Sequence, residues 1–154
     1  TIQIDLIIPG RLGVEYVDRN GNKKRPVVIH RAIAGSVERF IGILLEQYQG
    51  AFPLWLSPVQ VMVIPIADRH HDYAQKVYQA LKDADIRAEQ DLRSETMQAK
   101  IRDAQIQKVP YMIVVGDQEQ SQNNLAVRSK DGKNITSSLA EFITSTTRQI
   151  HDRN

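Results

Sequence analysis

The chain has 154 residues, of which 42% are hydrophobic and 25% charged, a composition typical of globular proteins. No apolar run approaches the ~20 residues that a transmembrane helix needs. The absence of cysteine excludes disulfide bonds and thiol catalysis. Residues 1–54 hold seven Lys and Arg against five Asp and Glu, whereas residues 55–154 hold thirteen of each. Nucleic-acid binding by the second part would therefore need a few well-placed groups, because it has no general basic field.

The first thirty residues have the pattern of antiparallel strands. Apolar residues alternate with polar or short ones in residues 2–8, which predicts a half-buried strand that Pro9-Gly10 ends. Strands are expected at residues 14–17 and 24–29, because the intervening Asn20-Gly21 pair supplies the positive φ angles that a hairpin turn requires.

A helix follows these strands. Ser36 is its expected N-cap, and the apolar spacing continues to about Tyr48, before a stop at Gly50. About 50 residues with one helix cannot close a core of their own. We therefore expect this region to be the cut end of a larger sheet-based domain, and the lack of an initiator Met also suggests trimming.

Beyond the turn-rich connection at residues 52–58, strands alternate with helices. The expected strands are residues 59–64, 86–90, 111–115 and 125–128, and the expected helices, capped by Asp68, Ser94 and Ser138, are residues 68–84, 94–107 and 138–150. This alternation predicts an α/β domain with right-handed crossovers between parallel strands and helices on both faces of the sheet.

Polar groups follow the strands of this domain. Residues 67–68, 91–95 and 116–119 lie at carboxyl ends, where open α/β sheets bind ligands. Arg128 ends the fourth strand and Arg102 lies on a helix, so two to four of these groups could converge on one ligand. Such a set suits the recognition of an unstacked base. The alternative is that they are ordinary caps and solvated loop charges.

The histidines and Arg39 carry weaker signals. His70 and His71 are about 100° apart on an expected helix, so they cannot share one metal ion, and we expect both at the surface. His30 closes a strand, where histidine is more often a satisfied core or turn residue than a ligand. Arg39 lies within an apolar helix pattern and could extend its charge to solvent.

Several stretches, however, resemble class II aminoacyl-tRNA synthetases. Residues 30–44 closely resemble the third class-defining motif, in the form found in threonyl-tRNA synthetases, and residues 1–5 resemble the active-site strand that precedes it. Residues 52–61, 91–93, 109–112 and 126–128 resemble the anticodon-binding domain of that family. The resemblance covers essentially the whole chain.

The resemblance implies two domains. Residues 1–51 would be the C-terminal strands and motif-three helix of an antiparallel-sheet catalytic domain. Residues 52–154 would be a three-layer anticodon-binding domain with a mixed, mainly parallel sheet. The implied function is that of a threonine–tRNA ligase, which activates threonine with ATP and transfers it to its tRNA.

The implied cofactors are Zn²⁺ and ATP with Mg²⁺. The implied partners are threonine, ATP, the anticodon loop of threonine tRNA and a second copy bound through the catalytic domain. The implied compartment is the cytoplasm, with no membrane. The first two class motifs and two zinc ligands are missing from these residues, so we expect the isolated chain to be inactive and not to bind zinc stoichiometrically.

Individual roles also follow from the resemblance. Arg39 matches the catalytic arginine that contacts ATP, where a guanidinium offsets charge on the triphosphate. Ser36 and Gln3 match positions in the nucleotide pocket, and Thr1 and Gln3 match positions that line the amino-acid pocket. His30 matches one of three protein ligands of a zinc ion that holds the threonine amino and hydroxyl groups and thereby rejects valine.

Positions that contact the anticodon are matched by Arg128, Glu119, Arg102 and Ser94. This chain departs from the family there: Ser94 stands where Asn is usual, Gln98-Ala99 where Gly-Phe is usual, and Asp131 where a basic residue is usual. These changes make the anticodon surface less basic, so we expect weaker affinity or redistributed contacts.

Two other functions stay open. A freestanding, non-catalytic RNA-binding or accessory module would begin with its own folded N-terminus, whereas residues 1–50 have the pattern of a cut sheet. A relative that charges proline, histidine or glycine is the other alternative, and the match of His30 to a zinc ligand argues against it.

Overall fold

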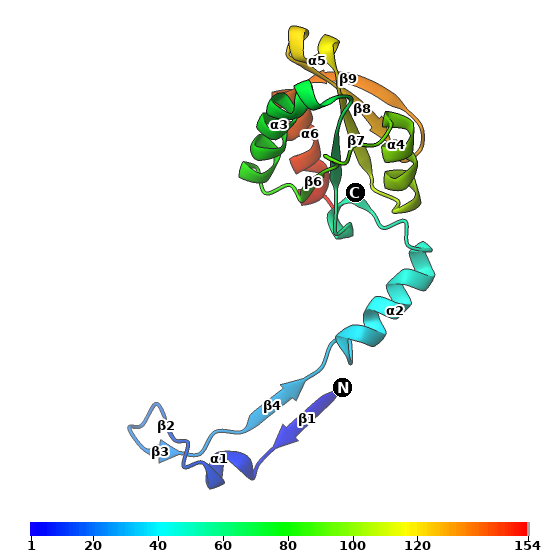
Figure 1. Ribbon diagram of the computed structural model, residues 1–154. Coiled ribbons are helices and arrows are strands. Elements are labelled where there is room, and N and C mark those ends of the chain that lie inside the picture. Colours follow the sequence, from blue (N-terminus) through cyan, green and yellow to red (C-terminus); the bar gives the residue numbers. More distant parts are fainter. Residues whose placement is uncertain (154) are drawn as a thin grey trace. The chain divides into compact units, whose positions relative to one another are not determined.

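The computed structural model describes residues 1–153 and divides the chain into two compact units, Thr1–Glu46 and Gln47–Asn154 (Figure 1). We call these the first and second units and describe each by itself. Within the described residues, no helix is long and apolar enough to cross a membrane. The assignment of residues 1–51 and 52–154 to two domains stays a prediction.

The first unit is built from short antiparallel strands and helices. Its elements are β1 (Ile2–Asp5), α1 (Ile8–Arg11), β2 (Tyr16–Val17), β3 (Lys23–Lys24), β4 (Val28–Arg31) and the start of α2 (Val37–Tyr48). β1 pairs with β4 and β2 pairs with β3, both antiparallel. The expected antiparallel pairing is thus observed.

Two strand boundaries in this unit were predicted wrongly. β1 stops at Asp5, because the Asp5 carboxylate accepts the backbone N–H groups of Ile7 and Ile8 at 2.8 and 2.9 Å and starts a helix there. The expected strand at residues 24–29 is divided into β3 and β4 around Pro26, which has no N–H to contribute to a ladder.

The hairpin turn and the N-cap of α2 are confirmed. Gly21 takes the left-handed conformation with φ +79°, whereas Asn20, which was expected to have a positive φ as well, does not. The Asp18 carboxylate accepts two backbone N–H groups of the turn. The Ser36 hydroxyl accepts the backbone N–H of Arg39 at 3.2 Å, at the start of α2.

The second unit is a five-stranded sheet with helices on both faces (Figure 1). Its strands are β5 (Val61–Pro65), β6 (Ala88–Gln90), β7 (Tyr111–Val115), β8 (Asn124–Ser129) and β9 (Asn134–Ser138), in the order β6-β5-β7-β8-β9. Its helices are the 3₁₀ turns η1 (Leu54–Leu56) and η2 (Asp68–His70), and α3 (His71–Asp83), α4 (Met97–Ile106), α5 (Asp117–Gln122) and α6 (Leu139–His151).

The prediction of a three-layer α/β domain with a mixed, mainly parallel sheet is confirmed. β5 pairs parallel with β6 and β7, and β8 pairs antiparallel with both β7 and β9. β9 therefore runs in the same direction as β7. In Figure 1, α3 and α6 lie on one side of the sheet and α4 on the other.

The core lies on both faces of this sheet. Val61, Val63 and Ile113 face α3 and α6, where they pack in one cluster with Leu81 and Phe142. Their neighbours in sequence point to the opposite face, where Met62, Ile64 and Met112 pack with Ala104 of α4. Because successive strand residues point to opposite faces, every residue of β5 is buried.

Two elements of the second unit were missed. β9 has the polar sequence Asn-Ile-Thr-Ser-Ser and lies at the sheet edge, so it lacks the apolar alternation by which strands are predicted. Its hairpin with β8 holds it in place instead. α5 contains only polar residues and buries none of them, so it has no helical apolar stripe.

The N-cap of α4 was also predicted wrongly. α4 begins at Met97, and the hydroxyl of Thr96 accepts the backbone N–H of Ala99 at 3.3 Å. Ser94 instead lies exposed in the loop before the helix. Both residues are capping types, and only the path of the chain after β6 decides between them.

This difference can be tested by substitution. Thr96→Ala should lower the free energy of unfolding by about 1 kcal/mol, because it removes the acceptor at the N-cap. Ser94→Ala, the matched control, should change it by less than about 0.5 kcal/mol. Urea unfolding followed by fluorescence of Trp55, the only tryptophan, measures both. A larger loss for Ser94→Ala than for Thr96→Ala would contradict the observed cap.

Candidate nucleic-acid interface

One face of the second unit is only half covered. α4 packs against β5, and a groove of about 330 Å³ opens between α4 and strands β7, β8 and β9. The groove is lined mainly by apolar atoms, from Met97, Ile101, Val114, Ala126, Val127, Arg128, Asn134, Ile135 and Thr136. An apolar groove with a few polar groups is typical of ligand sites.

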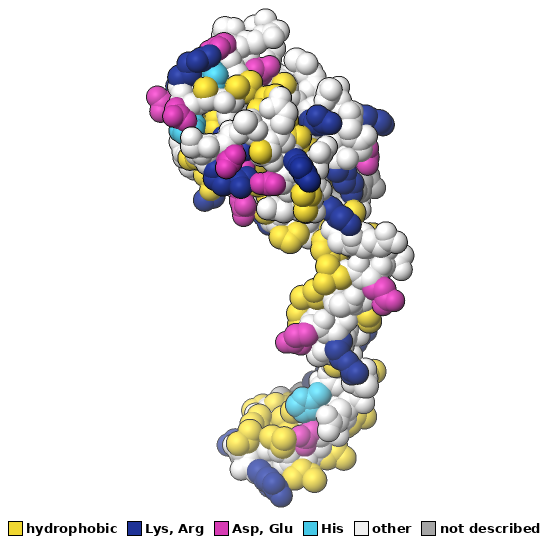
Figure 2. Space-filling model, turned by 45° about the vertical axis from the view of Figure 1, so that its right-hand side comes forward, with side chains coloured by type: hydrophobic (Ala, Val, Ile, Leu, Met, Phe, Trp, Pro, Cys, Tyr) yellow, Lys and Arg dark blue, Asp and Glu magenta, His cyan; other side chains and the backbone are white. Residues whose placement is uncertain are grey.

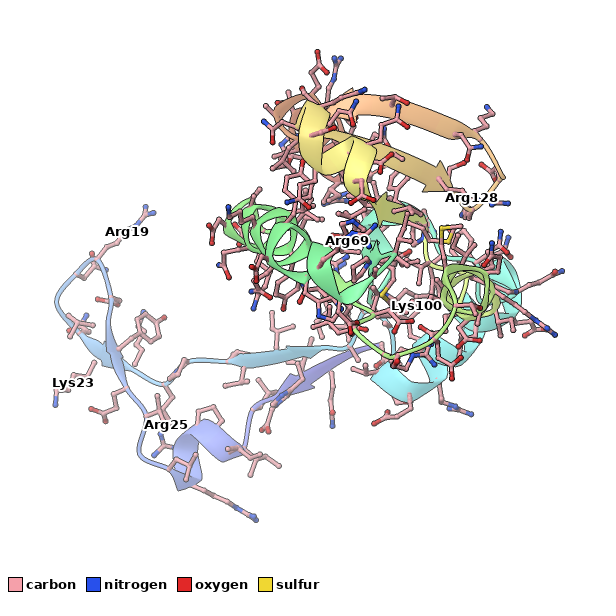
Figure 3. All side chains as sticks on the ribbon, turned by 45° about the horizontal axis from the view of Figure 1, so that its top comes forward. Arg19, Lys23, Arg25, Arg69, Lys100 and Arg128 are labelled. Atoms are coloured by element: carbon pink, nitrogen blue, oxygen red, sulfur yellow. The ribbon has the colours of Figure 1, made fainter. Side chains whose placement is uncertain are left out.

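Arg128 is the charged residue of this groove (Figure 3). It lies on β8 opposite Met112 of β7 and Asn134 of β9, which places it on the face that α4 covers. Its Nε is buried and has no hydrogen-bond partner among the described residues. A buried donor without a partner costs free energy, and a guanidinium has five N–H donors to offer. The groove therefore suits a ligand that carries acceptors.

The other expected anticodon residues do not line the groove and lie at separate places. Arg102 is exposed on α4, next to Ile101 of the groove, and Ser94 is exposed in the loop before α4. Glu119 lies on α5, and its carboxylate accepts the backbone N–H of Gly116 at 3.0 Å. The carboxylate is therefore held in one orientation before any ligand binds.

The expectation that Arg128 joins the groups at the carboxyl ends of the parallel strands is wrong. β8 runs antiparallel to β7, so Arg128 lies beside Met112, near the start of β7. Gly116 and Glu119 follow the other end of that strand. At about 3.3 Å per residue, the two positions are roughly 13 Å apart along the sheet.

Some of the groups at the carboxyl ends pair with one another instead. The Arg93 guanidinium donates to both oxygens of Asp91, at 2.9 and 2.6 Å, and to Asp103 Oδ2 at 2.8 Å. The bond from Arg93 holds the pKa of the Asp91 carboxyl below its usual value. For Asp91 and Arg93 the alternative interpretation, structural loop charges, is the better one, and Asp103 of α4 is their partner.

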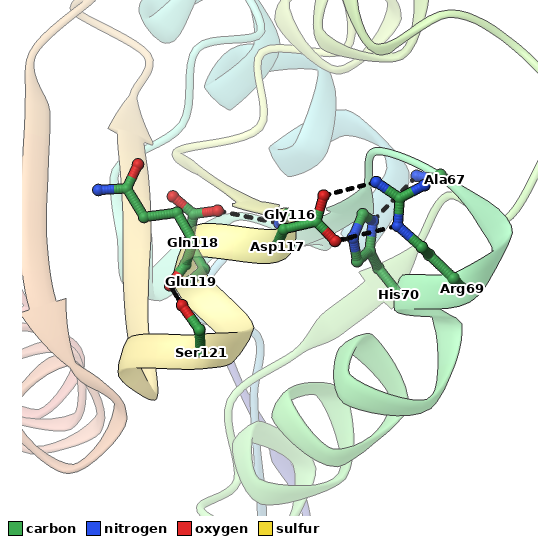
Figure 4. Close-up of polar contacts among 8 residues, drawn as sticks. All are labelled: Ala67, Arg69, His70, Gly116, Asp117, Gln118, Glu119 and Ser121. Atoms are coloured by element: carbon green, nitrogen blue, oxygen red, sulfur yellow. Dashed lines mark hydrogen bonds and ion pairs between the residues drawn. The ribbon is translucent and has the colours of Figure 1, made fainter.

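His70 was expected at the surface, which is wrong: only 1% of it is exposed. Its Nδ1 accepts the backbone N–H of Ala67 at 3.2 Å, so its proton is on Nε2, which lies 2.9 Å from Asp117 Oδ1 (Figure 4). Arg69 Nε donates to the same oxygen at 3.0 Å. The bonds from Arg69 and then from His70 lower the pKa of the Asp117 carboxyl strongly.

The 3₁₀ turn η2 also corrects the expected cap of α3. Asp68 is highly exposed and does not cap the helix, because α3 begins only after η2. The N–H of Ala67 is instead accepted by the His70 ring. Lys100 was missed as well: it is only 3% exposed, and its Nζ donates to the carbonyl of Pro65 at 3.3 Å. A buried lysine leaves no apolar signal in the sequence.

In the first unit, the expected amino-acid-binding residues lie on two paired strands. Gln3 of β1 is directly opposite His30 of β4, so their side chains share one face. The Thr1 carbonyl accepts the N–H of Ala32 at 3.0 Å, two residues further along the same strands. The expected nucleotide residues Ser36 and Arg39 are both exposed at the start of α2.

These residues alone do not form a zinc site. His30 Nε2 lies 3.7 Å from Asp5 Oδ2, and Asp5 already accepts two backbone N–H groups, which lower the pKa of its carboxyl. Within residues 1–153, no three His, Cys, Asp or Glu side chains are grouped so that they could hold a metal ion. Structural and catalytic zinc sites use at least three protein ligands.

Charges on the visible face of the second unit are mixed in sign (Figure 2). Acidic and basic side chains lie beside one another on the left, and mainly basic ones lie on the right. This matches the thirteen charges of each sign in residues 55–154. The second unit therefore has no general basic field, as its composition predicts.

The second unit is thus an α/β domain with a half-open groove, in which Arg128 is the charged lining residue. The chain belongs to the anticodon-binding domain family, because the family model described as "Anticodon binding domain" matches residues 60–148. This match spans the sheet and most of α6.

Curated relatives are named threonine--tRNA ligase. The protein from Aquifex aeolicus is 57% identical over 137 residues, which cover 89% of this chain and 22% of that protein. The protein from Thermus thermophilus is 49% identical over 154 residues, which cover 99% of this chain and 23% of that protein. The chain thus spans less than a quarter of these relatives.

Solved structures agree with this assignment. The RNA-binding domain of threonyl-tRNA synthetase from Cryptosporidium parvum has a TM-score of 0.77 and 34% identity, over 96% of this chain and 38% of that one. A prolyl-tRNA synthetase from the same organism has a TM-score of 0.65 at 22% identity, over 94% of this chain and 32% of that one. The second likeness concerns the fold alone.

Proposed function

We propose that this chain is the anticodon-reading part of a threonine–tRNA ligase and that its partner is the anticodon loop of threonine tRNA. The observation that carries the proposal is the Arg128 guanidinium, set in an apolar groove with a buried donor that has no partner among the described residues. The names of the relatives supply the tRNA and the amino acid.

The groove has the chemistry to read an unstacked base. Its apolar lining from Met97 and Ile101 suits the flat face of a base, and Arg128 donates to acceptors on the base edge. Asn134 and Thr136 on β9 add polar groups along the opposite side. Arg102, Ser94 and Glu119 are proposed to contact neighbouring nucleotides or phosphates.

The first unit is proposed to contribute to the catalytic site of the longer enzyme. There Arg39 and Ser36 contact ATP, which enters with Mg²⁺, while Thr1 and Gln3 line the pockets for threonine and ATP. His30 is proposed as one of three zinc ligands, with the other two supplied from outside this chain. The complete enzyme is proposed to be a cytoplasmic homodimer that joins through its catalytic domain.

Binding of an anticodon stem-loop tests the proposal. The chain should prefer the stem-loop of threonine tRNA over one with a scrambled anticodon by at least about fivefold, the lower end for loss of a bidentate base contact. Fluorescence anisotropy at fixed salt measures both affinities, since phosphate contacts depend on salt. Equal binding of the two RNAs would refute anticodon reading and leave a non-specific RNA-binding module.

A further inference from the structure

α5 is the helix of the second unit with the weakest apolar attachment. It has six residues, all polar, and buries none of them. Helices this short are not stable by themselves, so tertiary contacts must hold α5 in place. The helices α3, α4 and α6 each bury at least two side chains, which explains why they need no comparable device.

A set of polar contacts supplies this attachment at the first residue of α5. Asp117 receives Arg69 Nε and lies 2.9 Å from His70 Nε2, both from η2 (Figure 4). The His70 ring is almost fully buried and is itself held by the N–H of Ala67. We call His70, Arg69 and Asp117 the clamp. It ties the turn after β5 to the turn after β7.

The clamp lies next to the Glu119 carboxylate, whose orientation is also fixed by a hydrogen bond. Glu119, two residues after Asp117, accepts the N–H of Gly116, the residue before Asp117. The backbone of residues 116–119 therefore carries both the clamp contact and the Glu119 orientation. If Asp117 is released, both can shift together, because no side chain of α5 is buried.

We propose that the clamp positions Glu119 for contact with the anticodon loop, so that His70, Arg69 and Asp117 are positioning residues that do not themselves touch the RNA. The proposal rests on the proposed function of the chain. The clamp lies at the opposite end of β7 from Arg128, and through Glu119 it helps to determine specificity. Arg69 and His70 of η2 thereby affect RNA binding through the Glu119 carboxylate of α5.

A double-mutant cycle on the 154-residue chain tests this proposal. Asp117→Ala should weaken binding of the threonine anticodon stem-loop by about 5- to 10-fold, within the range of coupled neighbours. Glu119→Gln should weaken it at least as much. In the Glu119→Gln background, Asp117→Ala should have almost no further effect, because the carboxylate that the clamp positions has already been changed.

Asp68→Ala is the matched control. It removes the same charge from the same edge of the sheet, and Asp68 lies 3.6 Å from His71 and takes no part in the clamp. Its binding should stay within about twofold of the unchanged chain, as expected for an exposed residue. If Asp117→Ala folds poorly, Arg69→Ala takes its place, because it breaks the same ion pair by removing the arginine. It should weaken stem-loop binding by the same factor.

The outcomes separate this inference from the proposed function. Additive effects of Asp117→Ala and Glu119→Gln overturn the inference, since Asp117 or Arg69 then contacts RNA directly. Failure of the unchanged chain to prefer its stem-loop refutes the proposed function. In that case amide hydrogen exchange still tests whether the clamp holds α5 in place. Asp117→Ala should speed exchange at residues 116–122, and unchanged exchange there would overturn the inference.

Discussion

Arg128→Ala should weaken binding of the threonine anticodon stem-loop by about 1–3 kcal/mol, roughly 5- to 150-fold. The guanidinium lies in an apolar groove and has a buried Nε without a partner among the described residues, so its donors are ready for an RNA acceptor. Removing these donors removes the contact and leaves the acceptors on the base edge without a hydrogen bond. Anisotropy titrations at constant salt measure the loss.

Two variants separate shape from charge in this prediction. Arg128→Lys keeps the charge and loses the planar guanidinium, so its affinity for the stem-loop should fall between those of the unchanged chain and Arg128→Ala. Arg148→Ala removes the same charge from α6, on the opposite face of the sheet, where the side chain is 83% exposed. It should leave affinity within about twofold. Unchanged affinity in Arg128→Ala would eliminate the groove as the anticodon site.

Ile113→Ala should lower the free energy of unfolding of the second unit by about 2–5 kcal/mol. Ile113 lies in the central strand β7, is 0% exposed and packs in the cluster with α3 and α6. The substitution removes three buried carbons and leaves a cavity that the flanking helices cannot fill fully. Urea unfolding followed by Trp55 fluorescence measures the change.

Ile106→Ala serves as the control for this core substitution. It deletes the same atoms at the end of α4, where the side chain is 66% exposed, so it should cost less than about 0.5 kcal/mol. Similar losses for the two variants would place Ile113 outside the core. An anticodon stem-loop should still bind the folded fraction of Ile113→Ala.

Sequence patterns predicted the elements that bury apolar side chains. β5 and β7 are continuous apolar runs, and α3 and α6 carry apolar stripes. Each can therefore be predicted from its own stretch of sequence. The capping box of Ser138 and Glu141 was also confirmed, because its partners are only three residues apart. β9 and α5 bury too little to leave such a pattern.

The site residues divide in the same way. Arg128 and Glu119 were noted for their positions after strands and then matched to anticodon-binding positions by the resemblance, and their roles stay predictions. Their different places in the fold could not be predicted, because Arg128 was assigned to the wrong edge of the sheet until the antiparallel direction of β8 was known. His70 and Lys100 were misjudged or missed, since burial of a polar side chain depends on partners distant in sequence.

The sequence by itself determined the α/β class and most helices and strands, because these follow from local spacing of apolar and capping residues. The family resemblance came separately, from motifs such as residues 30–44. Only the tertiary structure decided which polar groups are paired and which face a groove. Asp91 and Asp117 are paired with arginines of their own chain, whereas the buried Nε of Arg128, beside α4, has no partner within residues 1–153. That distinction depends on strand direction and on contacts across the sheet, which local sequence does not encode.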